Sequence, residues 1–537
     1  MRLVDPERPA SAGPGSVRPA ATNGVFDARA LEPRTPVALF ASASGTRAAA
    51  WDGNDPPATH PGERLSGMLP PIYPEWLGDR GFALAHGARF PYVVGEMARG
   101  IATPEMVVAA AEAGLVGFFG SAGLSIEDVD AALGTIQARL GPARANWGAN
   151  LIHSLHDPEA ELTFAQLALA RGLKAVSASA FMRLSPAIVL LAAKGLTRGP
   201  AGQIIRPRHV FGKISRAEVA RQFLSPAPEP HLRNLIERGL LSPAEAELAR
   251  QVPVADDVTV EADSGGHTDN RPLTVVLPQI LRLAGEIATS RGYSAVPRIG
   301  AGGGIGTPAA LAATFAAGAG YVVTGSINQC TVQSGLSADG RRMLADADTA
   351  DVAMAPAADM FELGVKVQVL RRGTMFAQRG NKLYEVYRRY PSLEAIPLQE
   401  RLELEKSVLG RSCQEIWVDT RSYFANSAPH EIERAESDPK HKMALVFRWY
   451  LFMGAQWARE GTLARRGDYQ IWCGPAMGGF NQWVKNSFLE PPEARDVVQV
   501  ARNLLEGASQ IARAHALRMA GVGLPPHAFE FSPRQLA

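Results

Sequence analysis

The sequence predicts an α/β protein, a (β/α)8 barrel (TIM barrel) with an appended α-helical C-terminal domain. Two observations favour this fold class. Between about residues 90 and 325, short β-branched segments alternate with alanine-rich stretches, which is the pattern of βαβ units around a parallel sheet. There are eight such segments, most of them about 24 to 38 residues apart, and this count fits a closed barrel better than an open doubly wound sheet.

The eight strands expected from this pattern lie at Tyr92–Gly95, Val116–Gly120, Trp147–Leu151, Ala175–Ser179, His209–Ile214, Val258–Ala262, Pro297–Gly300 and Tyr321–Gly325. The longest gap follows the fifth strand and leaves an insertion at about 215–255. This insertion contains Ser242-Pro243-Ala244-Glu245, which is a capping box for a further helix. An insertion after a strand end suits a lid over the site, and packing alone would also explain it.

Two similar modules support the barrel. Gly100-Ile101-Ala102-Thr103-Pro104 and Gly304-Ile305-Gly306-Thr307-Pro308 each precede an alanine-rich stretch that ends in Ala-Gly at the same spacing. In each module the threonine can cap a helix, the proline can occupy the first turn, and the glycine can close the helix. Thr-Pro is a common helix start, but the matching spacing favours two copies of one β/α unit.

The pattern divides the chain into three parts. Residues 1–75 form a Pro- and Ala-rich segment that we expect to be a flexible leader. Residues 76–355 form the barrel, and 356–537 form the helical domain. In the last part, helical periodicity covers Met360–Gln378, Leu398–Leu409, Cys413–Ser427, Lys440–Arg459 and Glu493–Arg518.

Composition excludes several classes of function. The 537 residues carry a formal charge of +2, which gives no case for nucleic-acid binding. Three scattered cysteines, Cys330, Cys413 and Cys473, are too few for a disulfide framework or a zinc site, so we expect no metal and a cytoplasmic location. We expect neither a signal peptide nor a membrane span.

The strongest candidate binding motif is the glycine run Gly300–Gly306 after the seventh strand, together with Thr324-Gly325-Ser326 after the eighth. A phosphate needs several convergent backbone N–H groups at close approach, which glycine permits. Barrel enzymes commonly build such a site from these two loops and a helix N-terminus. The run lacks the G-x-G-x-x-G spacing of dinucleotide-binding folds in any register.

The second candidate motif is Glu261–Asp269 at the end of the sixth strand, which contains Asp263 and Gly265-Gly266-His267. Catalytic residues of barrels lie at the carboxyl ends of strands. The two glycines permit a tight turn that presents His267 to the barrel mouth, where an imidazole can give or take a proton.

Other strand ends offer weaker signals. Gly95-Glu96-Met97 follows the first strand, Asn150 and His153 end the third, Ser177 and Ser179 end the fourth, and Lys213 ends the fifth. Lys213 could equally form an ion pair at the barrel mouth. The aromatic, glycine-rich segment Asp468–Trp483 could be either packing between helices or the wall of a tunnel. The basic groups Lys440–Lys442 and Arg371-Arg372 are either solvated faces or a surface for an acidic partner.

Longer stretches resemble a known family. Asp263–Leu273, Val322–Gln329, Asp351–Val367, Asp438–Tyr450 and Asp468–Met477 are similar to the PfaD family, whose members are trans-acting enoyl reductases of polyunsaturated-fatty-acid and polyketide synthases. The glycine loops and Gly-Gly-His also resemble the flavin barrel of nitronate monooxygenases. The similarity extends from about Pro74 to about Ala508 and includes the helical part.

The resemblance implies FMN as the bound cofactor, NADPH as the hydride donor, and an enoyl chain on an acyl carrier protein as the substrate. It implies a cofactor site that comprises Gly95, Met97, Asn150, Ser177, Glu261, Asp263, Gly302, Gly303, Gly304, Gly325 and Ser326. Of these, Gly302, Gly303, Gly304, Gly325 and Ser326 would hold the phosphate. Glu96 departs from the small residue that such barrels more often have, and Asp263 departs from the more usual Glu.

The resulting hypothesis is a trans-acting enoyl reductase in which His267, or else Lys213, polarises the thioester or supplies a proton. One alternative is a nitronate monooxygenase-type flavin oxidase in which His267 abstracts a proton from a nitroalkane. Another is a non-catalytic scaffold that docks onto a synthase. The sequence leaves the oligomeric state open, and a homodimer through the helical domain is one option.

Overall fold

The computed structural model describes residues 27–53, 57–154 and 157–536, which fall into two compact units. The larger unit contains Tyr73–Ser509 and the residues from Phe531 onward. The smaller unit contains the described residues up to Ile72 together with Gln510–Glu530. The barrel and most of the helical segment therefore belong to one unit, whereas the sequence predicted two domains with a boundary near residue 355.

The predicted barrel is present and closed. Its strands are β4 (Tyr92–Val94), β5 (Val116–Phe119), β6 (Trp147–Ile152), β7 (Ala175–Ser179), β10 (His209–Ile214), β11 (Asp257–Glu261), β13 (Arg298–Gly302) and β14 (Val322–Thr324). All neighbours pair in parallel, and the barrel closes where Val322 of β14 lies opposite Tyr92 of β4. The fold class and the position of each strand are confirmed.

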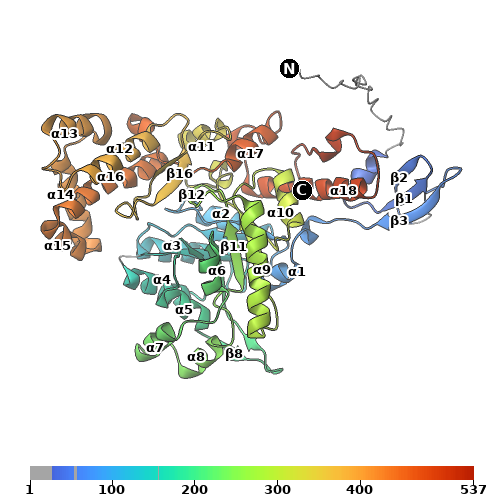
Figure 1. Ribbon diagram of the computed structural model, residues 1–537, viewed down its shortest axis with the longest axis horizontal. Helices are drawn as coiled ribbons and strands as arrows, with labels where there is room; N and C mark the ends of the chain where they lie inside the picture. The colour runs from blue at the N-terminus through green and yellow to red at the C-terminus, as the bar shows by residue number, and fades with distance from the viewer. Residues whose placement is uncertain (1–26, 54–56, 155–156, 537) are drawn as a thin grey trace, which may run out of the picture. The chain divides into compact units, whose positions relative to one another are not determined.

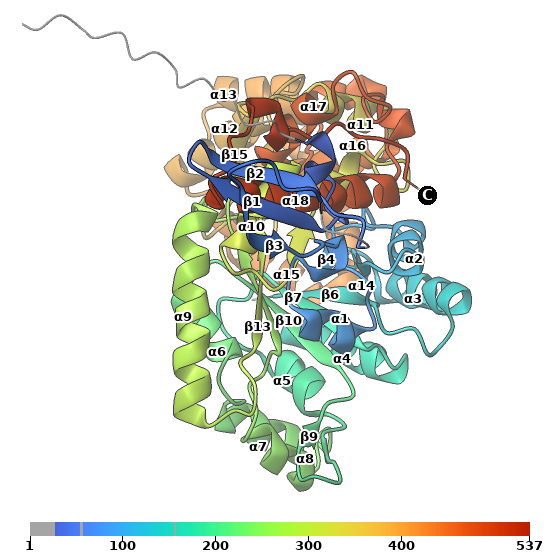
Figure 2. The ribbon, with the colours of Figure 1, turned by 90° about the vertical axis from the view of Figure 1, so that its right-hand side faces the viewer.

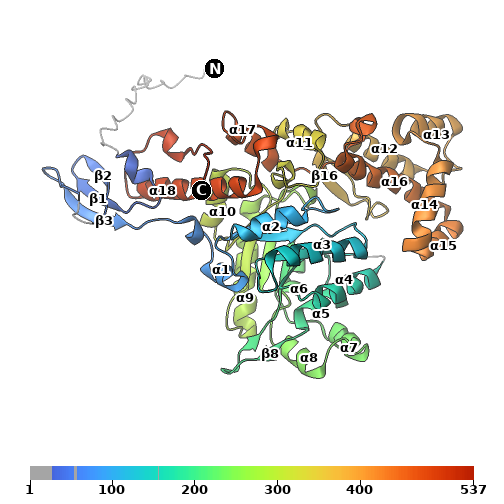
Figure 3. The same ribbon diagram turned by 180° about the vertical axis from the view of Figure 1, so that it is seen from behind.

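Helices cover the outside of the barrel. They are α2 (Pro104–Glu112), α3 (Ile126–Leu140), α4 (Pro158–Ala170), α5 (Pro186–Ala193), α6 (Ala217–Phe223), α9 (Leu273–Arg291) and α10 (Pro308–Ala316). Figure 3 shows α2, α3, α4 and α5 following one another around one side. The two predicted modules have the same helix start. The Thr103 side chain accepts a hydrogen bond from the Met106 N–H, and the Thr307 side chain accepts one from the Ala310 N–H. In each module proline occupies the first turn of the helix.

A buried ion-pair network closes the amino end of the barrel. Helix α1 (Arg80–His86) stacks Phe82 on Tyr321 and brings His86 Nε2 within 3.0 Å of Asp257 Oδ2. Arg298 donates two further hydrogen bonds to the same carboxylate, at 2.6 and 2.7 Å. Asp257 is fully buried, so the charge of Arg298 and the hydrogen bond of His86 are needed to offset its desolvation.

The insertion at 215–255 does not form the expected lid. It folds into α6, α7 (Glu229–Glu237) and α8 (Pro243–Ala249), and α8 has the predicted capping box. Helices α7 and α8 pack on α5, and their apolar residues join the core around the barrel. Figure 1 shows α7 and α8 at the end of the barrel away from α12–α16, beside the hairpin of β8 (Thr197–Arg198) and β9 (Ile204–Ile205). The amphipathic helices therefore bury their apolar faces against α5 and not across the barrel mouth.

After the barrel, one predicted helix is wrong. Residues 360–378 contain β16 (Lys366–Leu370), which pairs with β15 (Val352–Pro356) and with the two-residue strand β12 (Gly266–His267). The alternation of Val367 and Val369 with polar neighbours is a strand period, and both valines are buried. The other four expected segments match helices. They are α13 (Leu398–Leu404) with a π-helical turn (Glu405–Leu409), α14 (Cys413–Ser427), α16 (Pro439–Glu460) and α18 (Val497–Met519). The structure adds four helices that the sequence analysis did not give, namely α11 (Ala338–Ala345), α12 (Phe376–Arg389), α15 (Pro429–Ser437) and α17 (Ala476–Val484). No helix in the described part of the chain is long and apolar enough to cross a membrane.

The smaller unit corrects the prediction of a flexible leader, of which residues 1–26 lie outside the described part. Strands β1 (Val37–Ser42), β2 (Gly45–Ala50) and β3 (Arg64–Leu69) form an antiparallel sheet in the order β2-β1-β3, drawn in blue in Figure 2. Leu39 packs with Leu517 and Val522, which come from the end of the chain. Local composition does not predict this sheet, because residues far away in the sequence complete its core.

The Asp257 network yields a stability prediction. Replacing Asp257 with Asn should lower the free energy of unfolding by about 3–5 kcal/mol, because the Arg298 guanidinium loses its counter-charge and the buried His86 ring loses its charged hydrogen-bond partner. Asp130→Asn removes a half-exposed partner of Arg171 and should lower stability much less, because solvent screens that pair. Thermal and urea denaturation would measure both variants, and equal losses would contradict the assignment.

The same network makes stability dependent on pH. Although burial alone would raise the pKa of Asp257, the charges and hydrogen bonds of His86 and Arg298 lower it to about 2 from the usual 3.8. Because the folded-state pKa lies below the unfolded one, this contribution is present above about pH 4 and is lost as the pH falls toward 2. The Asn variant should lack this part of the acid dependence.

Candidate active site

The carboxyl ends of the barrel strands open into a cavity of about 580 Å³. Its walls come from the strand ends, from β16 and the preceding loop, and from α14, α15, α16 and the segment after them. This is the size and position at which barrel proteins bind cofactors and substrates. No residue of the 215–255 insertion lines this cavity among the described residues.

The glycine loops form an open cradle at this cavity. Gly302, Gly303, Gly304, Gly325 and Ser326 all line it, as the sequence predicted. Gly303 and Gly304 have φ of 92° and 73°, which favour glycine, and a Cβ on Gly303 would lie 2.8 Å from the Ala262 carbonyl carbon. A Cβ on Gly304 or Gly325 would meet nothing within 4 Å. Within the described chain, the backbone N–H groups of Gly303, Gly304, Gly325 and Ser326 donate to no other group. Free amides beside empty space suit an anion.

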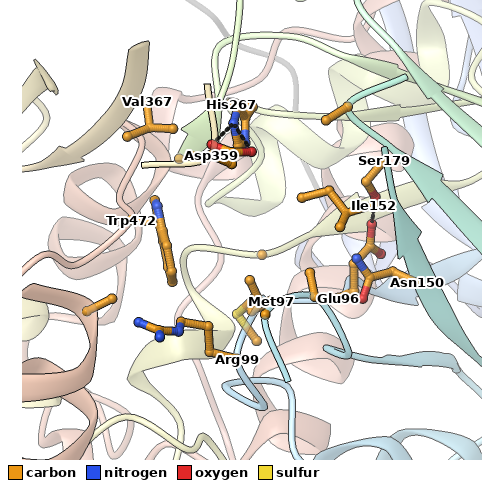
Figure 4. A pocket seen from close by; sticks show the side chains of 18 of the residues that line it. Glu96, Met97, Arg99, Asn150, Ile152, Ser179, His267, Asp359, Val367 and Trp472 are labelled. Carbon is orange, nitrogen blue, oxygen red and sulfur yellow. Dashed lines mark hydrogen bonds and ion pairs between the residues drawn. The ribbon is translucent and has the colours of Figure 1, made fainter. Parts of the chain in front are cut away.

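A lysine and two glutamates lie at the floor of the cavity. Lys213 Nζ lies 3.1 Å from Glu96 Oε1 and 3.1 Å from Glu261 Oε1. Glu96 Oε1 also accepts hydrogen bonds from the hydroxyls of Ser177, at 3.0 Å, and Ser179, at 2.7 Å. Figure 4 shows Glu96 beside Ser179 and Asn150. The ion pair that the sequence analysis offered as the alternative role for Lys213 is therefore present.

These contacts keep both sides of the ion pair charged. Burial alone would raise the pKa of Glu96, but the charge of Lys213 and the hydrogen bond from Ser179 outweigh burial, and the pKa is lowered. Burial would likewise lower the pKa of Lys213, but Glu261 and Glu96 raise it above its usual range. Lys213 is thus a fixed positive charge and a poor proton donor at neutral pH.

His267 lies at the opposite side of the cavity in a pair with Asp359. Its Nε2 lies 3.2 Å from the Asp359 carboxylate, as the dashed lines in Figure 4 mark. The two side chains are 30% and 42% exposed. Burial would lower the pKa of His267, but the charge and hydrogen bond of Asp359 outweigh it and raise the pKa above the usual 6.5. The imidazole therefore keeps a proton to higher pH than a free histidine does.

Strand pairing holds His267 in place. The short strand β12 pairs antiparallel with β16, with His267 opposite Val367. Both preceding glycines are required, because a Cβ on Gly265 would lie 2.8 Å from the Cys473 nitrogen and Gly266 has φ of 85°. The loop that carries His267 is therefore held between β16 and the segment at Cys473-Gly474, and only glycine fits there.

The aromatic segment Asp468–Trp483 lines the cavity in part. Gln470, Trp472, Gly474 and Ala476 contribute to its wall, and Gly474 donates its N–H to Ser326 Oγ at 3.1 Å. Gln329 donates to the Trp472 carbonyl at 2.5 Å. Of the two interpretations offered for this segment, the structure supports a wall of the cavity, and α17 adds helix packing behind it.

The other predicted residues divide into two groups. Gly95, Met97, Asn150 and Glu261 line the cavity. A Cβ on Gly95 would lie 2.8 Å from Val323 Cγ1, so packing against β14 is enough to require glycine. Ser177 and Asp263 do not line the cavity but lie behind its wall, where Ser177 binds Glu96 and Asp263 accepts from Asn270 and from Gln368.

For several charged or polar cavity residues, sequence reasoning gave no role or missed the partner, as three of them illustrate. Asp359 belongs to the stretch Asp351–Val367, which carried a family resemblance but no assigned role. His153 was noted, but not the contact of its Nδ1 with Glu161, at 2.8 Å. Arg99 was not noted, although it lies two residues beyond Met97 in the first predicted loop.

The closed parallel barrel, with a cavity at the carboxyl ends of its strands, places the chain in the class of (β/α)8 proteins. Among solved structures, the enoyl reductase domain of MlnA, from the macrolactin biosynthesis cluster of Bacillus amyloliquefaciens, is similar to this chain. It is 34% identical, the match covers 83% of this chain and 99% of that domain, and the TM-score is 0.79. The chain belongs to this family, the PfaD-like enoyl reductases with a nitronate monooxygenase-type barrel.

Two relatives give the biosynthetic context. One of the polyunsaturated fatty acid synthase subunits of Thraustochytrium sp. is 46% identical over 451 residues, which is 82% of this chain and 30% of that protein. The polyketide biosynthesis protein PksE of Bacillus subtilis is 43% identical over 434 residues, 81% of this chain and 56% of PksE. The chain thus spans only part of either relative. Residues 390–469 also match the family model for the inserted helical domain of acyl-carrier-protein S-malonyltransferase.

The contact between His267 and Asp359 can be tested directly. Asp359→Asn should lower the pKa of the His267 imidazole, because burial then acts without the opposing charge. An NMR titration of the histidine ring would measure the change. Asp419→Asn, which removes an exposed partner of Arg411, should leave that titration unchanged. An identical His267 titration in both variants would show that Asp359 does not control its charge.

Proposed function

We propose that this protein reduces the 2,3-double bond of an enoyl chain held as a thioester on an acyl carrier protein, with bound FMN and with NADPH as the hydride donor. One observation carries the proposal. A cradle of unpaired amides and a histidine with a raised pKa line the same cavity, in a chain similar to an enoyl reductase domain over nearly that domain's whole length. The products and the pathway would be those of polyketide or polyunsaturated-fatty-acid synthesis, as in the relatives.

The residues present fit FMN. Its phosphate would be held by the free N–H groups of Gly303, Gly304, Gly325 and Ser326, where glycine leaves space. Met97 and Asn150 line the same cavity and suit the apolar and polar parts of a flavin ring. FMN, when bound, supplies hydride transfer from NADPH to the β-carbon of the enoyl thioester.

His267 supplies the proton that completes the reduction. The hydride adds at Cβ, the double-bond electrons move toward the thioester carbonyl, and the α-carbon then takes a proton. With Nε2 donating to Asp359, the doubly protonated His267 can give its Nδ1 proton to the α-carbon or hydrogen-bond through Nδ1 to the carbonyl oxygen. NADPH becomes NADP⁺, and the histidine recovers its proton from solvent through its exposed side.

Lys213 serves as a fixed charge and not as the proton donor. Glu96 and Glu261 hold its ammonium group in place and raise its pKa. A group that stays protonated cannot deliver a proton readily, but it can orient the carboxylates that border the ring site. The two candidate catalytic residues therefore have different roles: His267 donates the proton, and Lys213 is a fixed positive charge.

A carrier-bound substrate accounts for the helical wall. A small nitroalkane needs little cavity beyond the barrel mouth, whereas a long acyl chain needs an extended apolar wall. Leu451, Phe452 and Ala455 of α16 and Phe424 of α14 line the cavity and provide such a surface.

The first test is a visible spectrum of the purified protein, followed by NADPH without air and then by a 2-enoyl thioester. The proposal expects flavin bands that bleach with NADPH and recover with the thioester. Bands that recover only with oxygen and a nitroalkane would favour the oxidase. A protein that holds no flavin and takes up no added FMN would favour the scaffold.

Replacing His267 should separate catalysis from cofactor binding. His267→Ala should retain FMN, because the residue lies outside the cradle, and should lower the rate of enoyl reduction by about 10²- to 10⁴-fold. His267→Gln keeps a hydrogen-bond donor without an ionisable ring and should be similarly slow. A parental rate in either variant would disprove the proton-donor role.

The pH profile gives an independent reading of the same role. Because the donor must be protonated, the parental rate should fall as the pH rises through the raised pKa of His267, above 6.5. Steady-state kcat across pH would show this decline. A profile that stays flat through this range would contradict the role.

A further inference from the structure

Arg99 is an arginine buried in the cavity wall. It lies in the loop between β4 and α2 with φ of 61°, held by its N–H, which donates to the Ala122 carbonyl at 2.7 Å. Its guanidinium lies over the ring of Phe452, 3.6 Å from the centroid, and Nη1 donates to the Phe452 carbonyl at 2.8 Å. Figure 4 shows the side chain beside Met97 and Trp472. The residue is only 6% exposed.

Arg99 has no direct carboxylate partner in the described part of the chain, where Glu460 acts on it only from beyond ion-pair distance. One backbone carbonyl is its one hydrogen-bond acceptor there. Other buried arginines are better satisfied: Arg208 donates to two carbonyls, and Arg495 donates to four acceptors. Burial, and then the charge of Arg459, lower the pKa of Arg99 to about 10. A buried cation left this way is costly unless a ligand completes it.

The acidic residues of the cavity are already engaged. Glu96 and Glu261 bind Lys213, Asp359 binds His267, and Glu431 binds His441 at 2.6 Å. Asp157 accepts the Ala160 N–H at the start of α4. A second arginine, Arg448, also lines the cavity one helical turn before Phe452, and it too has no carboxylate within 4 Å among the described residues. Around α16, Arg99 and Arg448 are therefore two positive charges without a direct carboxylate partner among the described residues.

We infer that Arg99, with the added charge of Arg448, forms a second anion site in the cavity, separate from the glycine cradle, which binds a phosphate group of an exchangeable ligand. This inference rests on the proposed function. Such a ligand can be the phosphopantetheine arm that carries the thioester, or the dinucleotide that supplies the hydride. A planar guanidinium held flat on a ring leaves its remaining N–H groups arranged for phosphate oxygens.

The test compares thioesters that differ in one phosphate. Crotonyl-4′-phosphopantetheine and crotonyl-pantetheine would be assayed with the FMN-loaded protein at saturating NADPH. Arg99→Gln should raise KM for the phosphorylated thioester about 10- to 100-fold and change that of crotonyl-pantetheine less than about threefold. Arg99→Lys, which keeps the charge, should recover part of the loss. Arg250→Gln, at a surface pair with Glu229, is the matched control.

Two further results identify the source of the phosphate or overturn the site. If KM for NADPH rises while both thioesters respond equally, the dinucleotide supplies the phosphate and the site stands. If all three KM values change together, or none changes, Arg99 only pins α16 to the barrel loop and the inference is wrong. Loss of FMN from Arg99→Gln, measured by flavin fluorescence, would also overturn it.

The two proposals can fail separately. If the parental protein reduces neither thioester, the proposed function fails. The anion site at Arg99 is then tested by calorimetric titration, which measures the binding of coenzyme A and of NADPH. Tighter binding of either ligand to the parental protein than to Arg99→Gln, by about tenfold or more, would still support the anion site, and equal binding would reject it.

Discussion

The contact of Lys213 with Glu96 and Glu261 organises the mouth of the barrel. Lys213 belongs to β10, and Glu96 follows β4, which lies on the opposite side of the closed sheet. The ion pair therefore crosses the barrel interior, and the serines of β7 add hydrogen bonds to the same carboxylate. Since these charges are mostly shielded from solvent, removing one leaves another without its partner. This constraint fixes a charged floor under the cavity and the direction of four strand ends.

Later parts of the chain complete the cavity above that floor. Strand β16 aligns the histidine loop, the loop before it supplies Asp359, and the segment around Trp472 packs against the glycines next to His267. The site is therefore a barrel mouth completed by its own C-terminal region. Most acidic side chains of the cavity bind cations within the protein, whereas Arg99 and Arg448 have no direct carboxylate partner among the described residues. The cavity therefore offers positive charge at these two residues to an incoming ligand.

The sequence alone determined the features that depend on local pattern. The barrel strands were predicted to within about two residues, because β-branched runs between alanine-rich segments specify them without reference to their neighbours. The helix caps at Thr103 and Thr307 could also be predicted, because they too depend on local sequence pattern. The glycine cradle was predictable because positive φ and close approach are properties of the loop itself, as Gly303 and Gly304 show. His267 was found from the paired glycines before it.

The tertiary structure decided the features whose partners lie far away in the chain. Asp359 acts on a histidine 92 residues earlier, and Arg99 meets a carbonyl 353 residues later. Strand β16 was predicted as helix, since its pairing with β12 has no local signal. The sheet of residues 37–69 was predicted as flexible because its core needs Leu517 and Val522. Local propensity describes what a segment prefers alone, and burial, charge pairing and strand pairing depend on what folding brings next to it.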